Sequence, residues 1–568
     1  MKAYAYLLLF ALTLGQAQKS PSTLRITYGK TSNGNPTDTQ NPIIVFTTDK
    51  ETVVTTKAII DKNAALPYEH SYIDRATKFY YQTAQLSPSA FTMTIDSAAI
   101  SKQTFEYLPN TKTILGYQCK MAKTVINSNT YEIWYTDALT QKAAPSVLGQ
   151  DLGLVLEVTR NGNFTIAATE VQKFKSIPKN PIPDFKRKPV DILTYRDLLW
   201  KSRFTQIAVF TNETINFSDN FGSNDSVLRF ASGTIIVRKI KMPAIAKNSR
   251  VFVDATTQSA GDAYDRTGSV FIVPTNRKLS FLDGLQQTAG SLPVYDNGNG
   301  KKYQGVVATE NYSPLLELMR FFTPFGIKHF NTIKLKNRVW QDSVYYRQDI
   351  TDLLPILDSK EIWVGANIGN YDKGGHKLSV NFTIHPQDAP SGNYNFVLPL
   401  FNTTNVMEMA GQEYPTMFNS EKGLEVTFSL KSGLKDAKLR YITTGHGGWE
   451  NGDEFVPKKN VVVLNGIEIF SFVPWRTDCG AYRSYNPASG NFANGLSSSD
   501  YSRSNWCPGT ATNPVYIDLG DLAPGNHNLQ IRIPQGAPEG NSFSSWNVSG
   551  VLLGTVDAAQ PENLRNQR

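Results

Sequence analysis

The sequence contains few of the residues that bind transition metals. Only 3 Cys and 6 His occur among its 568 residues. None of them stands at the spacing of a zinc finger or of a His pair flanked by Glu. We therefore expect no metal ion in this protein, and no other cofactor.

Charged residues are also scarce, and they form no dense basic stripe. Asp, Glu, Lys and Arg make up 19% of the chain, and the net charge is only +8. A nucleic-acid-binding surface normally concentrates Lys and Arg on one face. The three consecutive basic residues at 186–188 are more typical of a solvated linker. We expect no nucleic acid as a partner.

Long apolar runs are missing, apart from a short one at the start of the chain. Lys2 precedes an apolar run at residues 4–14, and small residues follow at 15–17. Such a run is too short to span a bilayer and is typical of a cleavable signal peptide. We expect residues 1–17 to be removed from a secreted or periplasmic protein that has no membrane span.

Aromatic residues, glycine and proline are plentiful by comparison. Aromatics are 11% of the chain, beside 40 Gly and 30 Pro, a composition that favours strands and turns. Residues 131–135, 269–273 and 378–384 alternate between apolar and polar, as half-buried strands do. Asn465-Gly466 between two apolar runs predicts a tight hairpin. The sequence predicts an all-β protein.

Linkers and turn residues divide the chain into segments. Residues 176–203 form a proline-rich, basic linker that contains one short predicted helix at 191–200. The many short strands on its C-terminal side favour two consecutive jelly-roll β-sandwiches, and a separate β-rich domain precedes it. We expect a monomer with these parts: signal peptide 1–17, N-terminal domain 18–175, linker 176–203, jelly rolls 204–390 and 391–556, and polar tail 557–568.

The N-terminal domain resembles the GLPGLI-type module of exported Bacteroidetes proteins. The resemblance rests on Leu115-Gly116-Tyr117, on Trp134-Tyr135-Thr136 and on residues 148–157. The signature Leu-Pro-Gly of that module reads Asp151-Leu152-Gly153 here. The module has no established catalytic residues, so the resemblance implies a fold and no chemistry.

Two stretches in the second half combine carboxylates with arginine and aromatic rings. One is Asp262-Ala263-Tyr264-Asp265-Arg266, and the other runs from Gly445-His446-Gly447 to Trp506-Cys507-Pro508-Gly509. Carboxylates whose pKa is tuned by their surroundings serve as general acids and bases. An arginine can stabilise a developing oxyanion. The pattern indicates acid-base chemistry on an amide or a glycosidic bond.

The order of these motifs resembles the peptide:N-glycosidase F family, over roughly residues 210–554. Matching segments in the family's order are residues 262–266, 320–325, 349–353, 439–447, 453–455, Arg503, 506–509 and 516–519. The resemblance implies an amidase that releases whole N-glycans from asparagine, with N-glycosylated proteins or peptides as its partners. It implies Asp265 and Glu454 as catalytic residues. The substrate-binding residues that it suggests are Tyr264, Arg266, Arg503 and His446.

The cysteines also fit this resemblance. Cys479 and Cys507 lie in one Gly/Ser/Asn-rich region, where an exported protein can oxidise them. The family also pairs these positions, so we expect a disulfide bond between them. Cys119 stands alone in an alternating segment, which predicts a small buried residue rather than a reactive thiol.

The chain departs from the family near the expected cleft. The two cysteines that the family has near residue 260 are missing, and three other positions differ. Tyr264 replaces a Trp, and Gly369, with Asp372 close behind it, stands where the family has a third glutamate. Gly326 stands where the family has a bulky aromatic residue. From the last two differences we expect a wider groove that admits a more substituted first N-acetylglucosamine.

Two other classes of function are compatible with the same residues. A non-catalytic glycan-binding module uses β-sandwiches without any chemistry, and fold alone does not exclude it. A glycoside hydrolase also works with two carboxylates, but it cleaves between sugars. The products formed from a glycopeptide separate all three classes.

Overall fold

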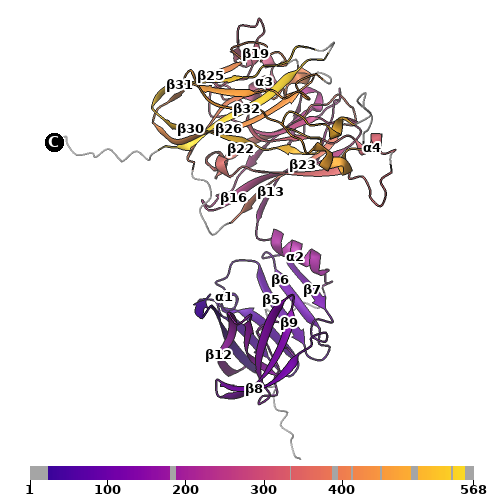
Figure 1. Ribbon diagram of the computed structural model, residues 1–568, viewed down its shortest axis with the longest axis vertical. Coiled ribbons are helices and arrows are strands. Elements are labelled where there is room, and N and C mark those ends of the chain that lie inside the picture. Colours follow the sequence, from indigo (N-terminus) through magenta and orange to yellow (C-terminus); the bar gives the residue numbers. More distant parts are fainter. Residues whose placement is uncertain are drawn as a thin grey trace, which may run out of the picture. The chain divides into compact units, whose positions relative to one another are not determined.

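The structure is a computed structural model. It describes residues 23–178, 187–332, 334–386, 394–410, 414–447, 451–487, 497–538 and 542–556. The expected signal peptide, the polar tail and most of the proline-rich stretch of the linker lie outside these residues. The chain divides into two compact units, Met1–Arg203 and Phe204–Arg568, which are coloured indigo to magenta and magenta to yellow in Figure 1.

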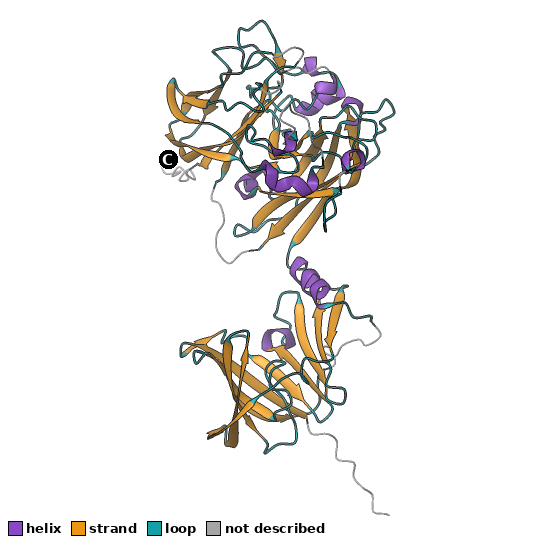
Figure 2. Cartoon of the chain, turned by 45° about the vertical axis from the view of Figure 1, so that its right-hand side comes forward, coloured by secondary structure: helices purple, strands orange, loops and turns teal. Residues whose placement is uncertain are grey.

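The first unit is built on one antiparallel sheet of twelve strands. Most strands pair with the strand before them in the chain, and the pairing of β1 with β12 joins the two halves of the sheet. Figure 2 shows that the sheet is curved. Its strands are β1 (Thr23–Ser32), β2 (Asn35–Thr37), β3 (Ile43–Thr47), β4 (Glu51–Thr56), β5 (Tyr68–Asp74), β6 (Tyr80–Gln85), β7 (Phe91–Asp96), β8 (Glu106–Ile114), β9 (Tyr117–Ile126), β10 (Asn129–Thr136), β11 (Leu154–Arg160) and β12 (Phe164–Phe174).

Apolar residues from alternate positions of these strands form the core of the first unit. Ile26 and Tyr28 of β1 are fully buried, and so is Leu156 of β11, because every second side chain of a strand points to the same face. Cys119 on β9 belongs to this core and forms no disulfide. The prediction that it is a small buried residue is confirmed.

The described residues of this unit include two helices, α1 (Lys57–Ile60) and α2 (Ile192–Lys201). The side chain of Asp191 accepts hydrogen bonds from the backbone N–H groups of Leu193 and Thr194, which satisfies two donors that a helix start leaves unpaired. The helix predicted at 191–200 is therefore confirmed, with Asp191 as its cap.

The second unit begins with a sandwich of two antiparallel sheets. One sheet has the order β13-β23-β16-β21, and the other has the order β14-β15-β22-β17-β20-β29. Val253, Val270 and Leu378 are fully buried between them. The strands are β13 (Thr205–Ile215), β14 (Leu228–Phe230), β15 (Ile235–Lys241), β16 (Arg250–Ser259), β17 (Thr267–Val273), β20 (Leu316–Phe322), β21 (Ser343–Asp349), β22 (Glu361–Ile368), β23 (His376–His385) and β29 (Ala511–Thr512).

A second sandwich follows, with sheets β24-β32-β26-β30 and β25-β31-β27-β28. Asn465 and Gly466 join β27 to β28 with φ values of 51° and 85°, and a tight hairpin of this kind needs positive φ at both positions. The predicted hairpin is confirmed. The strands are β24 (Phe396–Asn402), β25 (Leu424–Leu430), β26 (Leu434–His446), β27 (Asn460–Leu464), β28 (Ile467–Phe472), β30 (Val515–Leu522), β31 (Gly525–Arg532) and β32 (Ser545–Thr555).

Short helices and one small hairpin complete the second unit. None of these helices exceeds seven residues within the described part of the chain. They are α3 (Phe281–Gln286), α4 (Ile327–Phe330), α5 (Leu354–Leu357), η1 (Ala231–Gly233), η2 (Ala289–Ser291), η3 (Thr351–Leu353), η4 (Glu408–Ala410), η5 (Cys479–Tyr485) and η6 (Ser498–Asp500), and the hairpin is β18 (Val294–Tyr295) with β19 (Tyr303–Gln304). The predicted all-β class with two consecutive sandwiches is confirmed.

The two sandwiches share strands and side chains across their boundary. Tyr295 and Tyr303 of the β18–β19 hairpin pack in the core of the second sandwich, although the hairpin is inserted in the first. In return, β29 pairs with β20 of the first sandwich. On β32, Val551 and Leu553 pack in the first core and Leu552 packs in the second. Strand β32 therefore lies between two cores and is buried on both faces.

A buried ion pair also crosses this boundary. Glu317 and Arg320 on β20 are both fully buried, and two nitrogens of Arg320 donate to the two carboxylate oxygens of Glu317 at 3.0 and 2.7 Å. Arg320 Nη1 donates to Thr444 Oγ1 on β26 at 3.0 Å and to the backbone oxygen of Asn547 on β32 at 2.6 Å. Breaking a buried pair costs several kcal/mol because it leaves an uncompensated charge.

Spanning a bilayer with a helix requires length and apolar character together. Across the described residues, no helix combines the two.

Candidate active site

The candidate residues come from loops that connect strands of both sandwiches. Asp265 lies between β16 and β17, and Glu454 lies between β26 and β27. Arg503 lies between η6 and β29, and His446 is the last residue of β26. Residues up to about 240 positions apart in the sequence are thus placed in one region.

The loop that carries Asp265 is fixed by the segment at 323–326. The backbone N–H of Arg266 donates to Thr323 Oγ1 at 2.8 Å, and the N–H of Thr323 donates to the carbonyl oxygen of Arg266 at 2.9 Å. The Thr323 hydroxyl also donates to the carbonyl oxygen of Tyr264 at 3.3 Å. The side chain of Thr323 thus forms hydrogen bonds with the backbone on both sides of Asp265.

Gly326 does not have the role expected for it. Its N–H donates to the carbonyl oxygen of Ala263 at 3.0 Å, and a Cβ at Gly326 would lie 2.2 Å from the carbonyl oxygen of Asp262. A side chain at this position would therefore point at the loop that carries Asp265 and not into a groove. The interpretation of Gly326 as a widened groove is wrong, because glycine is needed here for the close approach of two backbones.

Asp262 holds the guanidinium of Arg266 in place. Its oxygens accept from Arg266 Nε at 2.8 Å and from Nη2 at 3.1 Å, and His376 Nε2 lies 3.3 Å away. Burial by itself would raise the pKa of Asp262, but the hydrogen bonds from His376 and Arg266 outweigh burial and lower it to about 2. Asp262 is therefore ionised at neutral pH, and it positions Arg266.

Asp265 and Glu454 meet on the same nitrogen of Arg503. The Nη1 atom lies 3.4 Å from Asp265 Oδ2 and forms a short ion pair with Glu454 Oε1. The Arg503 guanidinium also lies over the ring of Trp506, 4.2 Å from its centroid, a cation–π geometry that is attractive when desolvated. The side chain of Arg503 is only 1% exposed. Arg503 is therefore buried in contact with both carboxylates.

Burial raises the pKa values of both carboxyl groups, and the neighbouring Asp265 adds to the shift of Glu454. Burial raises the pKa of Asp265, and the charge of Arg503 opposes that shift. For Glu454, burial and the neighbouring Asp265 together outweigh Arg503 and raise the pKa to about 7. Two like charges that share one cation titrate as a pair. Near neutral pH this site therefore holds a carboxyl proton that can be exchanged.

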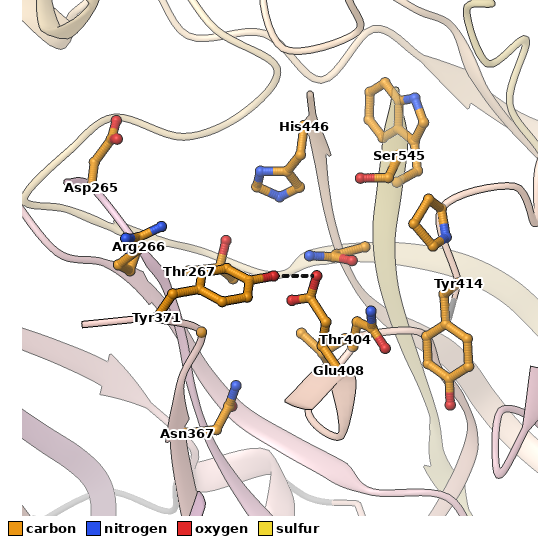
Figure 3. Close-up of a pocket in the computed structure, with 15 residues that line it drawn as sticks. Asp265, Arg266, Thr267, Asn367, Tyr371, Thr404, Glu408, Tyr414, His446 and Ser545 are labelled. Carbon is orange, nitrogen blue, oxygen red and sulfur yellow. Dashed lines mark hydrogen bonds between the residues drawn. The ribbon is translucent and has the colours of Figure 1, made fainter. Parts of the chain in front are cut away.

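A pocket of about 270 Å³ lies beside Asp265, and Figure 3 shows its walls. Three residues suggested by the sequence line it, together with residues of both sandwiches. Its lining residues are Asp265, Arg266, Thr267, Asn367, Gly369, Tyr371, Thr404, Asn405, Glu408, Tyr414, Pro415, His446, Ser545, Trp546 and Asn547. Such a mixture of polar groups and aromatic rings suits a sugar, which has both apolar faces and hydroxyl groups.

Two residues of this pocket could not be identified from the sequence. The hydroxyl of Tyr371 donates to Glu408 Oε1 at 2.9 Å, the bond drawn dashed in Figure 3. Tyr371 is 58% exposed, and the guanidinium of Arg266 lies 5.8 Å from the centroid of its ring. The pair places a carboxylate and an aromatic face on the wall of the pocket. Glu408 comes from a three-residue turn of the other sandwich, and no local pattern marks it.

Glu454 and Arg503 are not among the residues that line the pocket, and neither are Tyr264 and Asp372. Tyr264 is 55% exposed, and Arg266 lies 5.3 Å from its ring centroid. Asp372 uses Oδ1 to accept from the backbone N–H groups of Gly374 and Gly375, which fixes a turn. Asp372 therefore does not replace the family's third glutamate.

The described residues contain no cluster of His, Cys, Asp or Glu that could hold a metal ion. Polar groups in and around the pocket are paired with protein groups: Tyr371 with Glu408, Arg266 with Asp262, and Arg503 with Glu454. The chemistry available here is that of two carboxyl groups, a buried guanidinium and a neutral histidine.

The expected disulfide bond between Cys479 and Cys507 is present and spans 28 positions of the chain. It joins η5 to the residue that follows Trp506, whose ring contacts Arg503. The bond therefore anchors the segment that carries the shared guanidinium.

Removing this disulfide is expected to destabilise the second unit by about 3–4 kcal/mol, because a loop of this size gains conformational entropy when it opens. Urea unfolding of the Cys479→Ser/Cys507→Ser double variant measures the loss. Cys119→Ala removes a thiol from the first unit only and serves as the control. A double variant with an unchanged transition for the second unit would contradict the expectation.

Three family models match the chain along most of its length. The N-glycanase peptide N-terminal domain matches residues 26–197. The N-terminal domain of peptide-N-glycosidase F matches residues 206–384, and its C-terminal domain matches residues 413–553. The resemblance of the N-terminal domain to the GLPGLI-type module stays a prediction.

Among solved structures, two match nearly the whole chain. Two crystal forms of PNGF-II, in space groups C2 and P21, are 55% identical to this chain in sequence. They cover 95% and 94% of this chain and 99% and 100% of their own, with TM-scores of 0.87 and 0.89. PNGase F, a glycosylasparaginase from Flavobacterium meningosepticum, is 16% identical with a TM-score of 0.41, and covers 62% of this chain and 98% of its own. A comparison with curated protein sequences gave no match.

Proposed function

Because the chain belongs to the peptide:N-glycosidase F family, we propose that it is a peptide-N4-(N-acetyl-β-glucosaminyl)asparagine amidase. Such an enzyme hydrolyses the amide bond between the side chain of asparagine and the first N-acetylglucosamine of an N-glycan. The observation that carries the proposal is the pair of carboxylates, Asp265 and Glu454, held on one buried arginine beside a sugar-sized pocket. Its substrates are N-glycosylated proteins or peptides.

The reaction adds water to an amide. The water oxygen bonds to the carbonyl carbon, the C–N bond breaks, and the nitrogen leaves with an additional proton as a glycosylamine. The asparagine becomes aspartate. One group must therefore accept a proton from water, and another must deliver a proton to the leaving nitrogen.

We assign the first of these tasks to Asp265, because it lines the pocket where the substrate amide must lie. We assign the second task to Glu454, as the source of the proton for the leaving nitrogen. Glu454 shares Arg503 with Asp265, and its pKa is raised to about 7. Arg266 faces the same pocket and is aimed by Asp262, so it can stabilise the developing oxyanion. Tyr264, beside Arg266, is assigned to the substrate at the outer side of the site.

We also propose that the protein works outside the cytoplasm. The disulfide between Cys479 and Cys507 supports an oxidising compartment, where such bonds form and persist.

Mass spectrometry of a glycopeptide treated with the protein tests the proposed function. An amidase leaves aspartate at the former glycosylation site and releases the complete glycan. A glycoside hydrolase leaves one N-acetylglucosamine on asparagine, and a binding module leaves the glycopeptide intact. Either of these last two results would contradict the proposal.

The pH dependence of the reaction is expected to reflect Glu454. A carboxyl group with a pKa of about 7 loses its proton as the pH rises through that value, so kcat should fall on the alkaline side of neutrality. In Glu454→Gln this side chain cannot titrate. We expect kcat to be about 10²-fold lower, with no decline centred near pH 7.

Glu468→Gln is the matched control, because Glu468 is an exposed glutamate of the same sandwich with 47% of its side chain accessible. Its pH profile should equal that of the wild type. If Glu454→Gln keeps both its rate and the alkaline decline, another group is the source of the proton.

A further inference from the structure

His446 takes part in a chain of hydrogen bonds that begins at the buried ion pair. Arg320 Nη1 donates to Thr444 Oγ1 at 3.0 Å, and Thr444 Oγ1 lies 2.7 Å from His446 Nε2. Arg320 and Thr444 are both 0% exposed. The histidine ring at the end of this chain lines the pocket.

The available protons fix the direction of each bond. A guanidinium only donates, so Arg320 must give its proton to Thr444 Oγ1. The hydroxyl of Thr444 then has one proton of its own to donate, and across the described residues His446 Nε2 is its one recorded partner besides Arg320. If Nε2 carried a proton, the buried Thr444 hydroxyl would have no acceptor, which is costly. His446 Nε2 therefore accepts, and the ring proton resides on Nδ1.

The histidine also stays neutral. Burial lowers the pKa of His446 to about 3, and the charges of Arg320 and Arg503 act in the same direction. A neutral imidazole carries one N–H group. At neutral pH the ring is thus a hydrogen-bond donor at Nδ1 and does not act as a general acid.

The ion pair at the start of the chain cannot easily rearrange. Glu317 accepts from Arg320 through both oxygens, and it also accepts from the hydroxyls of Ser269 and Ser549. A buried polar network in which every member is satisfied holds one arrangement. Arg320 therefore presents Nη1 to Thr444 in a constant direction.

Aromatic rings hold the plane of the imidazole. The ring of His446 lies 5.3 Å from that of Trp506 and 5.7 Å from that of Phe322, with interplanar angles of 35° and 30°. Trp506 is itself fixed, since its Nε1–H donates to the carbonyl oxygen of Gly445 at 2.9 Å. Both the tautomer of His446 and its orientation are thus set before any substrate binds.

We propose that the Nδ1–H of His446 binds the carbonyl oxygen of the 2-acetamido group on the first sugar, and that Thr444 and Arg320 are positioning residues that fix this donor. The inference rests on the proposed function. The substrate has two amide carbonyl groups. The amide to be cleaved belongs beside Asp265, and Figure 3 shows Asp265 and His446 apart on the pocket wall, which leaves the acetamido carbonyl for His446.

The first test measures the tautomer directly and needs no substrate. Nitrogen-15 NMR of the histidine-labelled full chain distinguishes a neutral ring protonated at Nδ1 from one protonated at Nε2, and His446→Gln assigns the signal. We expect the Nδ1–H form in the wild type and in Thr444→Ser. Thr444→Val keeps the shape but removes the hydroxyl, and the signal should move toward the Nε2–H form. An Nε2–H ring in the wild type would overturn the proposal.

The second test asks what the donor recognises. A glycopeptide whose first sugar carries a trifluoroacetamido group has a weaker carbonyl acceptor than its acetamido counterpart. The wild type should cleave the acetamido peptide several-fold faster in kcat/KM, and Thr444→Val should reduce this ratio to about one, because a single hydrogen bond is worth about tenfold. Thr444→Ser should restore the preference.

Thr443→Val is the matched control. Thr443 is also 0% exposed on β26, and its hydroxyl donates to Asn460 Oδ1 at 2.8 Å, away from His446. This variant should keep the wild-type ratio. If Thr444→Val and the wild type show the same ratio of kcat/KM for the two peptides, His446 does not bind the acetamido group. If the wild type releases no glycan from either peptide, the proposed function fails instead, and the tautomer result stands by itself.

Discussion

Asp265→Asn is expected to lower kcat for glycan release by about 10²- to 10⁴-fold, the range that a positioned general acid or base contributes. Asn has the same shape as Asp but accepts no proton at neutral pH. Because the Asp265 side chain lies 3.4 Å from Arg503 and lines the pocket, its replacement removes a reacting group and leaves the loop intact. Release of glycan from a labelled glycopeptide measures the loss.

Asp372→Asn is the control for this variant. Asp372 caps the neighbouring turn through the N–H groups of Gly374 and Gly375, and Asn can accept the same bonds. Its kcat should be close to that of the wild type. A folded Asp265→Asn protein with nearly normal turnover would show that Asp265 is not the water-activating residue.

Arg503→Met is expected to lower kcat/KM by about 10²- to 10³-fold, similar to the removal of a preorganised charge from other active sites. The charge of Arg503 lowers the pKa values of both Asp265 and Glu454. Without it both pKa values should rise further, so the ionised base forms only at higher pH. We therefore expect the optimum of kcat/KM to move toward alkaline pH, which a rate profile across neutral pH records.

Arg476→Met provides the comparison. Arg476 and Arg503 exchange backbone hydrogen bonds, but the side chain of Arg476 pairs with Asp478 and not with the two carboxylates. This variant should keep the wild-type optimum. An Arg503→Met protein whose optimum is also unchanged would exclude electrostatic control of the pair by Arg503.

The parts of the fold that could be predicted from the sequence depend on neighbours in the chain. Alternation predicted strands such as β10 and β23, because burial of one face repeats every second residue. The strand predicted at 269–273 is present as β17, but it is not half-buried as expected, since all five of these residues are buried. Asn465-Gly466 predicted its hairpin, because few residues tolerate two successive positive φ values. Asp191 and the apolar residues after it were sufficient for α2.

The parts that the sequence did not reveal depend on contacts between distant segments. Tyr371 and Glu408 are 37 positions apart and come from different sandwiches, and Arg320 reaches Thr444 across 124 positions. The error at Gly326 has the same origin. A sequence shows that a side chain is missing, but it does not show that the missing atom would point at the carbonyl oxygen of Asp262.

The exchange of the β18–β19 hairpin and of β29 between the sandwiches has a consequence for how the protein unfolds and how it can change. Each sandwich completes its core or its sheet with residues from the other, so neither is a separable module. The pair should melt as a single cooperative transition. Recombination between relatives at a point near residue 390 would combine two sandwiches from different proteins. The core residues and strand pairs that each sandwich takes from the other would then not match. Such chimaeras should fail to fold, and lineages are therefore expected to inherit the two sandwiches together.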